Sequence, residues 1–159
     1  MPNRRHAVLP LLFGFSFMAL AAGSVTAADR EFARERLQSM VDRLRSELAI
    51  ADSVRVKIVP TNPLLVSVEP VEPAGGTNTY LMSFEEPFLA GLEDDELQAI
   101  VAHELGHVWI FTHHPYLQTE RLANHVAMRA VSRTSLERVY VKVWERAGTK
   151  GDLAHFLGQ

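Results

Sequence analysis

The chain of 159 residues contains no cysteine. Disulfide bonds and thiolate metal ligands are therefore excluded, as is a lipid-modified N-terminal cysteine. Any bound metal ion would depend on imidazole nitrogen or on oxygen. Because small domains of eukaryotic secretory pathways usually carry disulfides, an exported protein of this composition fits a bacterial periplasm or exterior better.

A strong net charge is also lacking. The 16 Lys and Arg residues and 19 Asp and Glu residues give a formal net charge of −3. This balance offers no basic surface for nucleic acid and no acidic run of the kind found in disordered tails. Hydrophobic residues make up 47% and charged residues 22%. These proportions are ordinary for a globular protein, and the length fits one domain.

One marked apolar stretch is present, at residues 7–22. It is shorter than the roughly 20 residues that span a bilayer. A pair of arginines precedes it and small residues at 25–27 follow it, in the order typical of a secretory signal peptide. We therefore expect a signal peptide at 1–27 and one exported domain at 28–159, with no stable membrane insertion after cleavage. A retained membrane anchor is the alternative.

The spacing of the hydrophobic residues predicts an α+β domain. Helical periodicity indicates an N-terminal amphipathic helix, and segments that alternate or are rich in valine indicate a small, mostly antiparallel three-stranded sheet. Further helices follow, the first with acidic residues at its start, where the helix dipole favours them. The predicted elements are a helix at 29–50, strands at 53–60, 64–71 and 77–84, and helices at about 94–113, 118–131 and 135–147.

Two histidines and a glutamate lie close together on the first of these later helices, in the sequence His103-Glu104-Leu105-Gly106-His107. Residues four apart share a helix face, so both imidazoles can bind one ion. Two neutral imidazoles suit Zn²⁺, and Glu104 lies where it can take a proton from metal-bound water. We expect one Zn²⁺ per chain and Glu104 as the catalytic base. Two unrelated surface histidines are the alternative.

The glycine inside this motif is informative. Gly106 lies in a helix interior, where glycine costs about 1 kcal/mol relative to alanine. Its presence predicts the close approach of another backbone or of a substrate.

A catalytic zinc needs a third protein ligand and an open position. His113 has the spacing of the longer motif H-E-x-x-H-x-x-G-x-x-H. That motif turns sharply at its glycine, where this chain has the β-branched Ile110, a residue type that disfavours positive φ. His113 therefore stays an alternative ligand, in a metzincin-like site.

Glu120 is the favoured third ligand. It opens the predicted helix at 118–131, and the small residues of that helix, among them Ala123, allow it to pack closely against the first helix. Asn124 shares the face of Glu120 and can hydrogen-bond a ligand histidine, which fixes the histidine tautomer. The alternative for Glu120 is a carboxylate that only responds to the helix dipole.

The sequence around the motif resembles a known group of enzymes. The segment 93–107 looks like the active-site helix of the HtpX-like and Ste24-like gluzincin peptidases. Asn62, the strand at 79–84 and the turn at 89–92 precede it in an order similar to that of these families. The resemblance covers roughly residues 54–131. It implies a zincin-like fold, a zinc cofactor and hydrolysis of peptide bonds.

In those families the third zinc ligand is the glutamate of an E-x-x-A-D pattern. Glu120, Ala123 and Asn124 match this pattern except at the last position, where asparagine replaces aspartate. The E-x-x-A-N form is also similar to the ImmA/IrrE-type peptidases. Asn124 would raise the basicity of its histidine less than an aspartate does. The short segment between His107 and Glu120 lacks the membrane helices of HtpX-type enzymes, which indicates a minimal soluble form.

Together these observations predict a zinc endopeptidase that acts on exported proteins or peptides. A zinc-stabilised binding or adaptor module without catalysis is the alternative. We expect the strand at 77–84 to be the sheet edge that holds an extended substrate. Hydrolysis also needs a donor for the tetrahedral oxyanion. The candidates are His113, His114, Tyr116, His125 and Tyr140.

Overall fold

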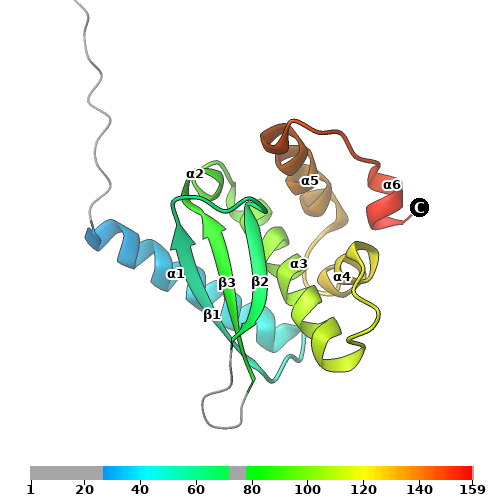
Figure 1. Cartoon of the computed structure of the whole chain (residues 1–159), viewed down its shortest axis with the longest axis horizontal. Coiled ribbons are helices and arrows are strands. Elements are labelled where there is room, and N and C mark those ends of the chain that lie inside the picture. Colours follow the sequence, from blue (N-terminus) through cyan, green and yellow to red (C-terminus); the bar gives the residue numbers. More distant parts are fainter. Residues whose placement is uncertain (1–26, 72–77, 159) are drawn as a thin grey trace, which may run out of the picture.

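The computed structural model describes residues 27–71 and 78–158. Nearly all of the predicted signal peptide lies outside these ranges. The described chain is an α+β domain, which confirms the predicted class (Figure 1). Its elements are α1 (Ala27–Glu47), β1 (Ser53–Val59), β2 (Val66–Val71), β3 (Thr79–Glu85), α2 (Glu86–Leu89), α3 (Asp94–His113), α4 (Glu120–Ala127), α5 (Arg133–Ala147) and α6 (Leu153–Leu157).

The three strands form a mixed sheet in the order β1-β3-β2. β3 lies in the centre, parallel to β1 and antiparallel to β2. The prediction of a mostly antiparallel sheet is wrong for the β1–β3 pair, because it assumed that consecutive strands pair with each other. Instead β3 inserts between β1 and β2, so β2 becomes an edge strand, and this strand contacts α3.

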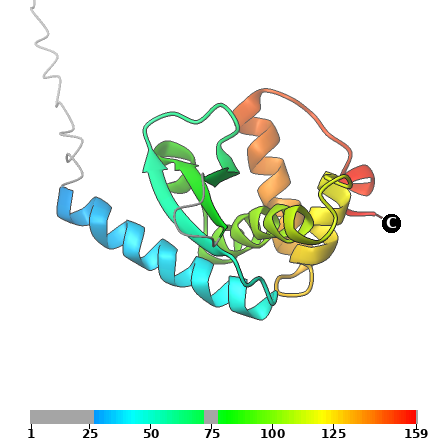
Figure 2. The ribbon, with the colours of Figure 1, turned by 60° about the horizontal axis from the view of Figure 1, so that its bottom comes forward.

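The helices pack around α3. Figure 2 shows α1 running beside the sheet, while α3 extends from the sheet towards α4 and α5. α3 contacts α1, α4, α5 and β2. The core between these elements includes Leu44, Met82 and Phe84, which are fully buried. Within the described ranges, no helix is both long and apolar enough to cross a bilayer.

Local sequence signals set the ends of α3. At its start, Glu93 and Glu96 form a capping box in which each side chain accepts a hydrogen bond from the backbone N–H of the other residue. At its end, the helix stops at His113, since the residue before Pro115 disfavours the helical region. Buried Glu96 also accepts a hydrogen bond from Lys142 at 2.6 Å, which links α3 to α5.

Three helices differ from the prediction. α4 ends at Ala127, short of the predicted residue 131. α5, in contrast, ends at Ala147 as predicted, directly before Gly148, whose positive φ of 65° suits glycine. α2 and α6 were not predicted, because helices of 4 and 5 residues carry too little periodicity to be recognised.

The close approach predicted at Gly106 occurs between α3 and α4. A methyl group added to Gly106 would lie 2.9 Å from both the Cα and the carbonyl carbon of Ala123. No side chain at residue 106 can avoid this backbone without separating the two helices. Gly106 therefore sets the distance between α3, which carries the histidines, and α4, which carries Glu120.

We expect Gly106→Ala to lower the free energy of unfolding by about 1–3 kcal/mol, because overpacking outweighs the gain in helix propensity. Urea unfolding followed by circular dichroism measures the change. Gly91→Ala is the matched control, since its methyl group would meet the Phe88 carbonyl oxygen at an ordinary 3.4 Å. Equal stability of the two variants would contradict this account of the helix contact.

Candidate metal centre

His103 and His107 lie one turn apart on α3 and point in the same direction. Their Nε2 atoms are 3.3 Å apart, and the rings meet edge to face. His103 is buried and His107 is half-buried. The two imidazoles therefore converge, as the four-residue spacing of His103 and His107 predicts.

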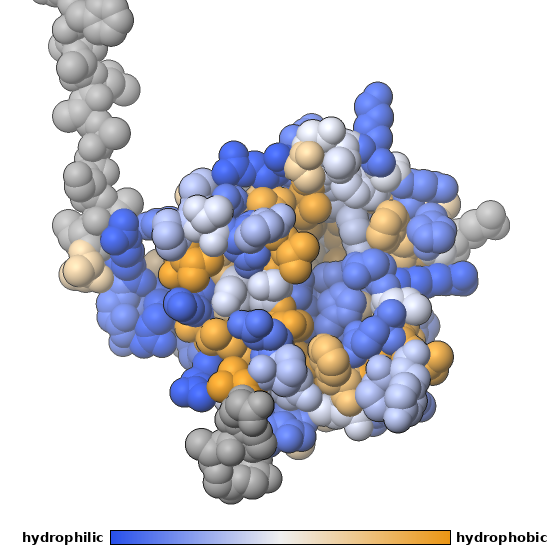
Figure 3. All heavy atoms as spheres, viewed as in Figure 1, coloured by the Kyte–Doolittle hydropathy of each residue, from blue (hydrophilic) through white to orange (hydrophobic). Residues whose placement is uncertain are grey.

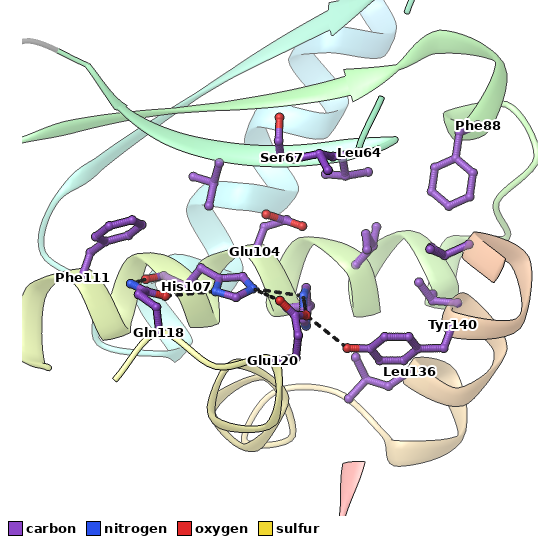
Figure 4. A pocket seen from close by; sticks show the side chains of 16 residues that line it. Leu64, Ser67, Phe88, Glu104, His107, Phe111, Gln118, Glu120, Leu136 and Tyr140 are labelled. Atoms are coloured by element: carbon purple, nitrogen blue, oxygen red, sulfur yellow. Dashed lines mark hydrogen bonds and ion pairs between the residues drawn. The ribbon is translucent and has the colours of Figure 1, made fainter. Parts of the chain in front are cut away.

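Glu120 reaches both imidazoles from α4. It is the first residue of that helix, directly after Thr119, whose side chain caps the helix by accepting a hydrogen bond from the Leu122 N–H. One carboxylate oxygen of Glu120 lies 3.2 Å from His103 Nε2, and the other lies 3.4 Å from His107 Nε2 (Figure 4). His103, His107 and Glu120 thus form one cluster that could hold a metal ion.

The distances within this cluster match a zinc site. Zinc bound tetrahedrally at about 2.0–2.1 Å separates any two of its ligand atoms by roughly 3.3–3.4 Å. The two Nε2 atoms are 3.3 Å apart, and each lies near a different oxygen of Glu120, at 3.2 Å for His103 and 3.4 Å for His107. Two imidazoles and one carboxylate form a donor set that zinc favours, and a fourth position is left for water or substrate. The donor set and its spacing therefore fit zinc.

The other ring nitrogen of each histidine is held by a side-chain amide. His103 Nδ1 lies 2.8 Å from Asn124 Oδ1, and His107 Nδ1 lies 3.2 Å from Gln118 Oε1. Because both partners are amide oxygens, each Nδ1 carries the hydrogen and donates it. Each Nε2 then directs its lone pair into the cluster, as a metal ligand requires.

The electrostatics of the cluster favour a positive charge at its centre. Hydrogen bonds with His103 and His107 hold the pKa of Glu120 far below its usual range. Burial lowers the pKa of His107, but its bond to Glu120 and the charge of Glu104 outweigh burial and raise it. Both shifts arise from the attraction between the Glu120 carboxylate and the imidazoles beside it, and the same negative charge would stabilise a cation there.

Asn124 uses its amide in a way that aspartate could not. The side chain is fully buried, and its Nδ2 donates to the Tyr140 hydroxyl at 2.7 Å and to the Phe156 carbonyl at 3.0 Å. Its Oδ1 is occupied by His103. A carboxylate would place a second oxygen against the Phe156 carbonyl with no hydrogen between them. The Phe156 carbonyl of α6 therefore favours asparagine over aspartate at residue 124.

Asn124→Asp should lower the free energy of unfolding by about 1–3 kcal/mol at neutral pH, since a buried acceptor then faces another acceptor. The measurement is urea unfolding of the metal-free protein. Asn78→Asp, at an exposed position, is the control for adding a negative charge. A variant at residue 124 as stable as the wild type would show that the Phe156 carbonyl does not select the amide.

Glu104 lies beside the cluster on the wall of a cavity. The cavity has a volume of about 410 Å³ and lies between β2 and α3, and the Glu104 carboxylate is directed towards β2 (Figure 4). Glu104 is buried, and burial raises its pKa despite the opposing effect of His103 and His107. A carboxylate with a raised pKa is a stronger base than an exposed one.

Tyr140 is the one predicted oxyanion donor that lines this cavity. Its hydroxyl lies 3.5 Å from a Glu120 oxygen, and burial raises its pKa, so the hydroxyl stays protonated. The structure does not bring the other candidates to the cluster. His114, Tyr116 and His125 are exposed.

His113, the alternative ligand, is also directed elsewhere. It is exposed, its ring stacks on Trp109 at 4.2 Å, and its Nδ1 lies 2.9 Å from the Trp109 carbonyl oxygen. The turn needed to carry His113 back to the other histidines does not occur, because α3 continues without a break through Ile110.

The expectation that the strand at 77–84 is a substrate-binding edge is wrong. β3 is the central strand and pairs on both sides. β2 is the edge beside the cavity, and three of its residues line that cavity. The Glu85 N–H donates to the Leu65 carbonyl, which makes Leu65 and Glu85 a hydrogen-bonded pair of the antiparallel ladder. Because such pairs alternate along the strands, the backbone groups of Val68 and the carbonyl of Val66 are directed away from β3, while the Val66 N–H donates to the Leu64 carbonyl at 2.7 Å.

Two parts of the site were missed by sequence reasoning. Gln118 orients His107 from the loop before α4 and also bonds the His107 carbonyl at 3.4 Å. Its position two residues before Glu120 is the only available signal. The Phe156 carbonyl is a backbone group on a helix without a recognisable pattern, so nothing in the sequence pointed to it.

Comparisons with protein-family models, with curated proteins and with solved structures found no match to this chain.

We expect the metal-free protein to bind one equivalent of Zn²⁺ and to unfold at a higher temperature when zinc is bound. Glu120→Gln should weaken zinc binding by more than the roughly 10–100-fold typical of losing a residue that only orients a ligand. His113→Ala should leave the affinity unchanged. Competition with a chelating dye measures both. If His113→Ala lost zinc affinity and Glu120→Gln did not, His113 and not Glu120 would be the third ligand.

Proposed function

We propose that this protein is a zinc-dependent endopeptidase that hydrolyses peptide bonds in exported proteins or peptides. The observation that carries the proposal is the convergence of His103, His107 and Glu120 on one point, with Glu104 beside them in an open cavity. A structural zinc site would use four protein ligands, whereas three ligands and an accessible fourth position are typical of a catalytic one.

The side chains of the cavity supply the remaining requirements of hydrolysis. Bound zinc would lower the pKa of a water molecule and polarise the substrate carbonyl. Glu104 takes the proton from the attacking water and returns it to the leaving amine, and its raised pKa suits both steps. Tyr140 keeps its hydroxyl hydrogen and can donate it to the developing oxyanion. Asn124 and Gln118 keep both histidines in the binding tautomer.

The edge strand β2 offers a binding surface for an extended peptide substrate. The outward N–H and C=O groups of Val68 and the outward C=O group of Val66 lie beside the cavity and can pair with a substrate backbone. Pro70 lies two residues after Val68 and has no backbone N–H, so it cannot donate a hydrogen bond to a substrate strand. Backbone pairing of this kind would position a peptide bond over the metal cluster whatever the side chains of the substrate are.

Glu104→Gln should reduce cleavage of casein or of a fluorogenic peptide by at least about 100-fold, because general base catalysis contributes that much or more. Its zinc content should equal that of the wild type, since Glu104 is not in the ligand cluster. Peptidase assays together with metal analysis of the purified domain test this. Stoichiometric zinc without any cleavage that depends on Glu104 would support the non-catalytic adaptor instead.

A further inference from the structure

The cavity that contains the metal cluster has two chemically different ends. Along α3, the residues that line it are Ile100, His103, Glu104, His107 and Phe111, which follow one helix face. The cluster occupies the middle of this row. At a rise of about 1.5 Å per residue, Ile100 lies about 4.5 Å before His103 along the helix axis, on the side of the helix N-terminus.

The end near Ile100 is closed by apolar side chains. α5 contributes Leu136, Val139 and Val143, which lie on one helix face together with Tyr140, and α2 contributes Phe88. In Figure 3 the surface is hollowed between β2 and α5, and hydrophobic side chains line the hollow. In Figure 4, Phe88 and Leu136 face this end from opposite sides.

Tyr140 lies between the metal cluster and the apolar end of the cavity. Its hydroxyl bonds Asn124 and Glu120 on the metal side, while its ring lies in the apolar row of α5. The opposite end of the cavity is polar at Gln118 and His107 and is bordered by the partly exposed Phe111.

Resting on the proposed function, we infer that the apolar end of the cavity is a specificity pocket for a bulky, uncharged side chain, of leucine or phenylalanine type, beside the cleaved bond. The pocket is continuous with the metal cluster, so a peptide held over the cluster places a neighbouring side chain there. Among the described residues that line the cavity, the only carboxylates are Glu104 and Glu120, and lysine and arginine do not occur. An acidic side chain would therefore meet repulsion and find no partner.

The test uses fluorogenic peptides of one sequence that carry leucine, alanine or aspartate at each position next to the cleaved bond. We expect kcat/KM for leucine at one of these positions to exceed that for alanine by at least about tenfold, as apolar pockets discriminate side chains of different size. Aspartate should be cleaved least. Equal rates for the three peptides at both positions would overturn the inference.

Val143→Phe should fill the pocket. We expect it to abolish the preference for leucine over alanine while the alanine peptide is still cleaved. Val141→Phe is the matched control, because it makes the same change on the same helix at an exposed position outside the cavity. It should keep the wild-type ratio. An unchanged ratio in Val143→Phe, or an equal loss in both variants, would overturn the assignment of the pocket.

A measurement of peptide binding without cleavage distinguishes failure of this inference from failure of the proposed function. In Glu104→Gln protein labelled at its methyl groups, the leucine peptide should shift the NMR signals of Ile100, Leu136 and Val139, and the aspartate peptide should not. Shifts without any cleavage by the wild type would refute the peptidase and keep the pocket. Cleavage that depends on Glu104, without a leucine preference or methyl shifts, would refute the pocket and keep the peptidase.

Discussion

The contact between α3 and α4 at Gly106 is the constraint on which the candidate site depends. The two histidines come from one helix and the carboxylate from the next, so the ligand set exists only at one separation of the helices. Because Gly106 has no side chain, the backbone of Ala123 occupies the space that a methyl group at residue 106 would need. A glycine that weakens the helix by itself thus makes possible the ligand distances of 3.2–3.4 Å.

A second set of contacts holds the imidazoles at the correct angle. Asn124 and Gln118 orient one histidine each, and both are neutral amides. Neutral partners fix a tautomer without adding negative charge, so the carboxylates at the site are Glu120 in the cluster and Glu104 beside it. Asn124 also bonds Tyr140 and the Phe156 carbonyl, which connects the metal site to α5 and α6 through one buried side chain.

The parts that the sequence predicted are those with local causes. The spacing of His103 and His107, the acidic start of α3 and the end of that helix before Pro115 all depend on residues within a few positions of one another. The convergence of Glu120 and Asn124 on the histidines was also predicted, because the small residues of α4 indicated close packing. Longer-range geometry was not accessible. The insertion of β3 between β1 and β2, and the use of the Phe156 carbonyl, depend on segments that meet only in the folded chain.

The ligands occupy one short part of the chain, from His103 to Glu120, and no strand contributes to them. The sheet, in contrast, closes through pairs distant in sequence, as in the parallel register of Ser53 with Thr79. Contacts that are local in sequence form faster than such pairings, because less chain entropy is lost before they are made. The contact between α3 and α4 that brings the cluster together is therefore less costly in chain entropy than the pairing of β1 with β3.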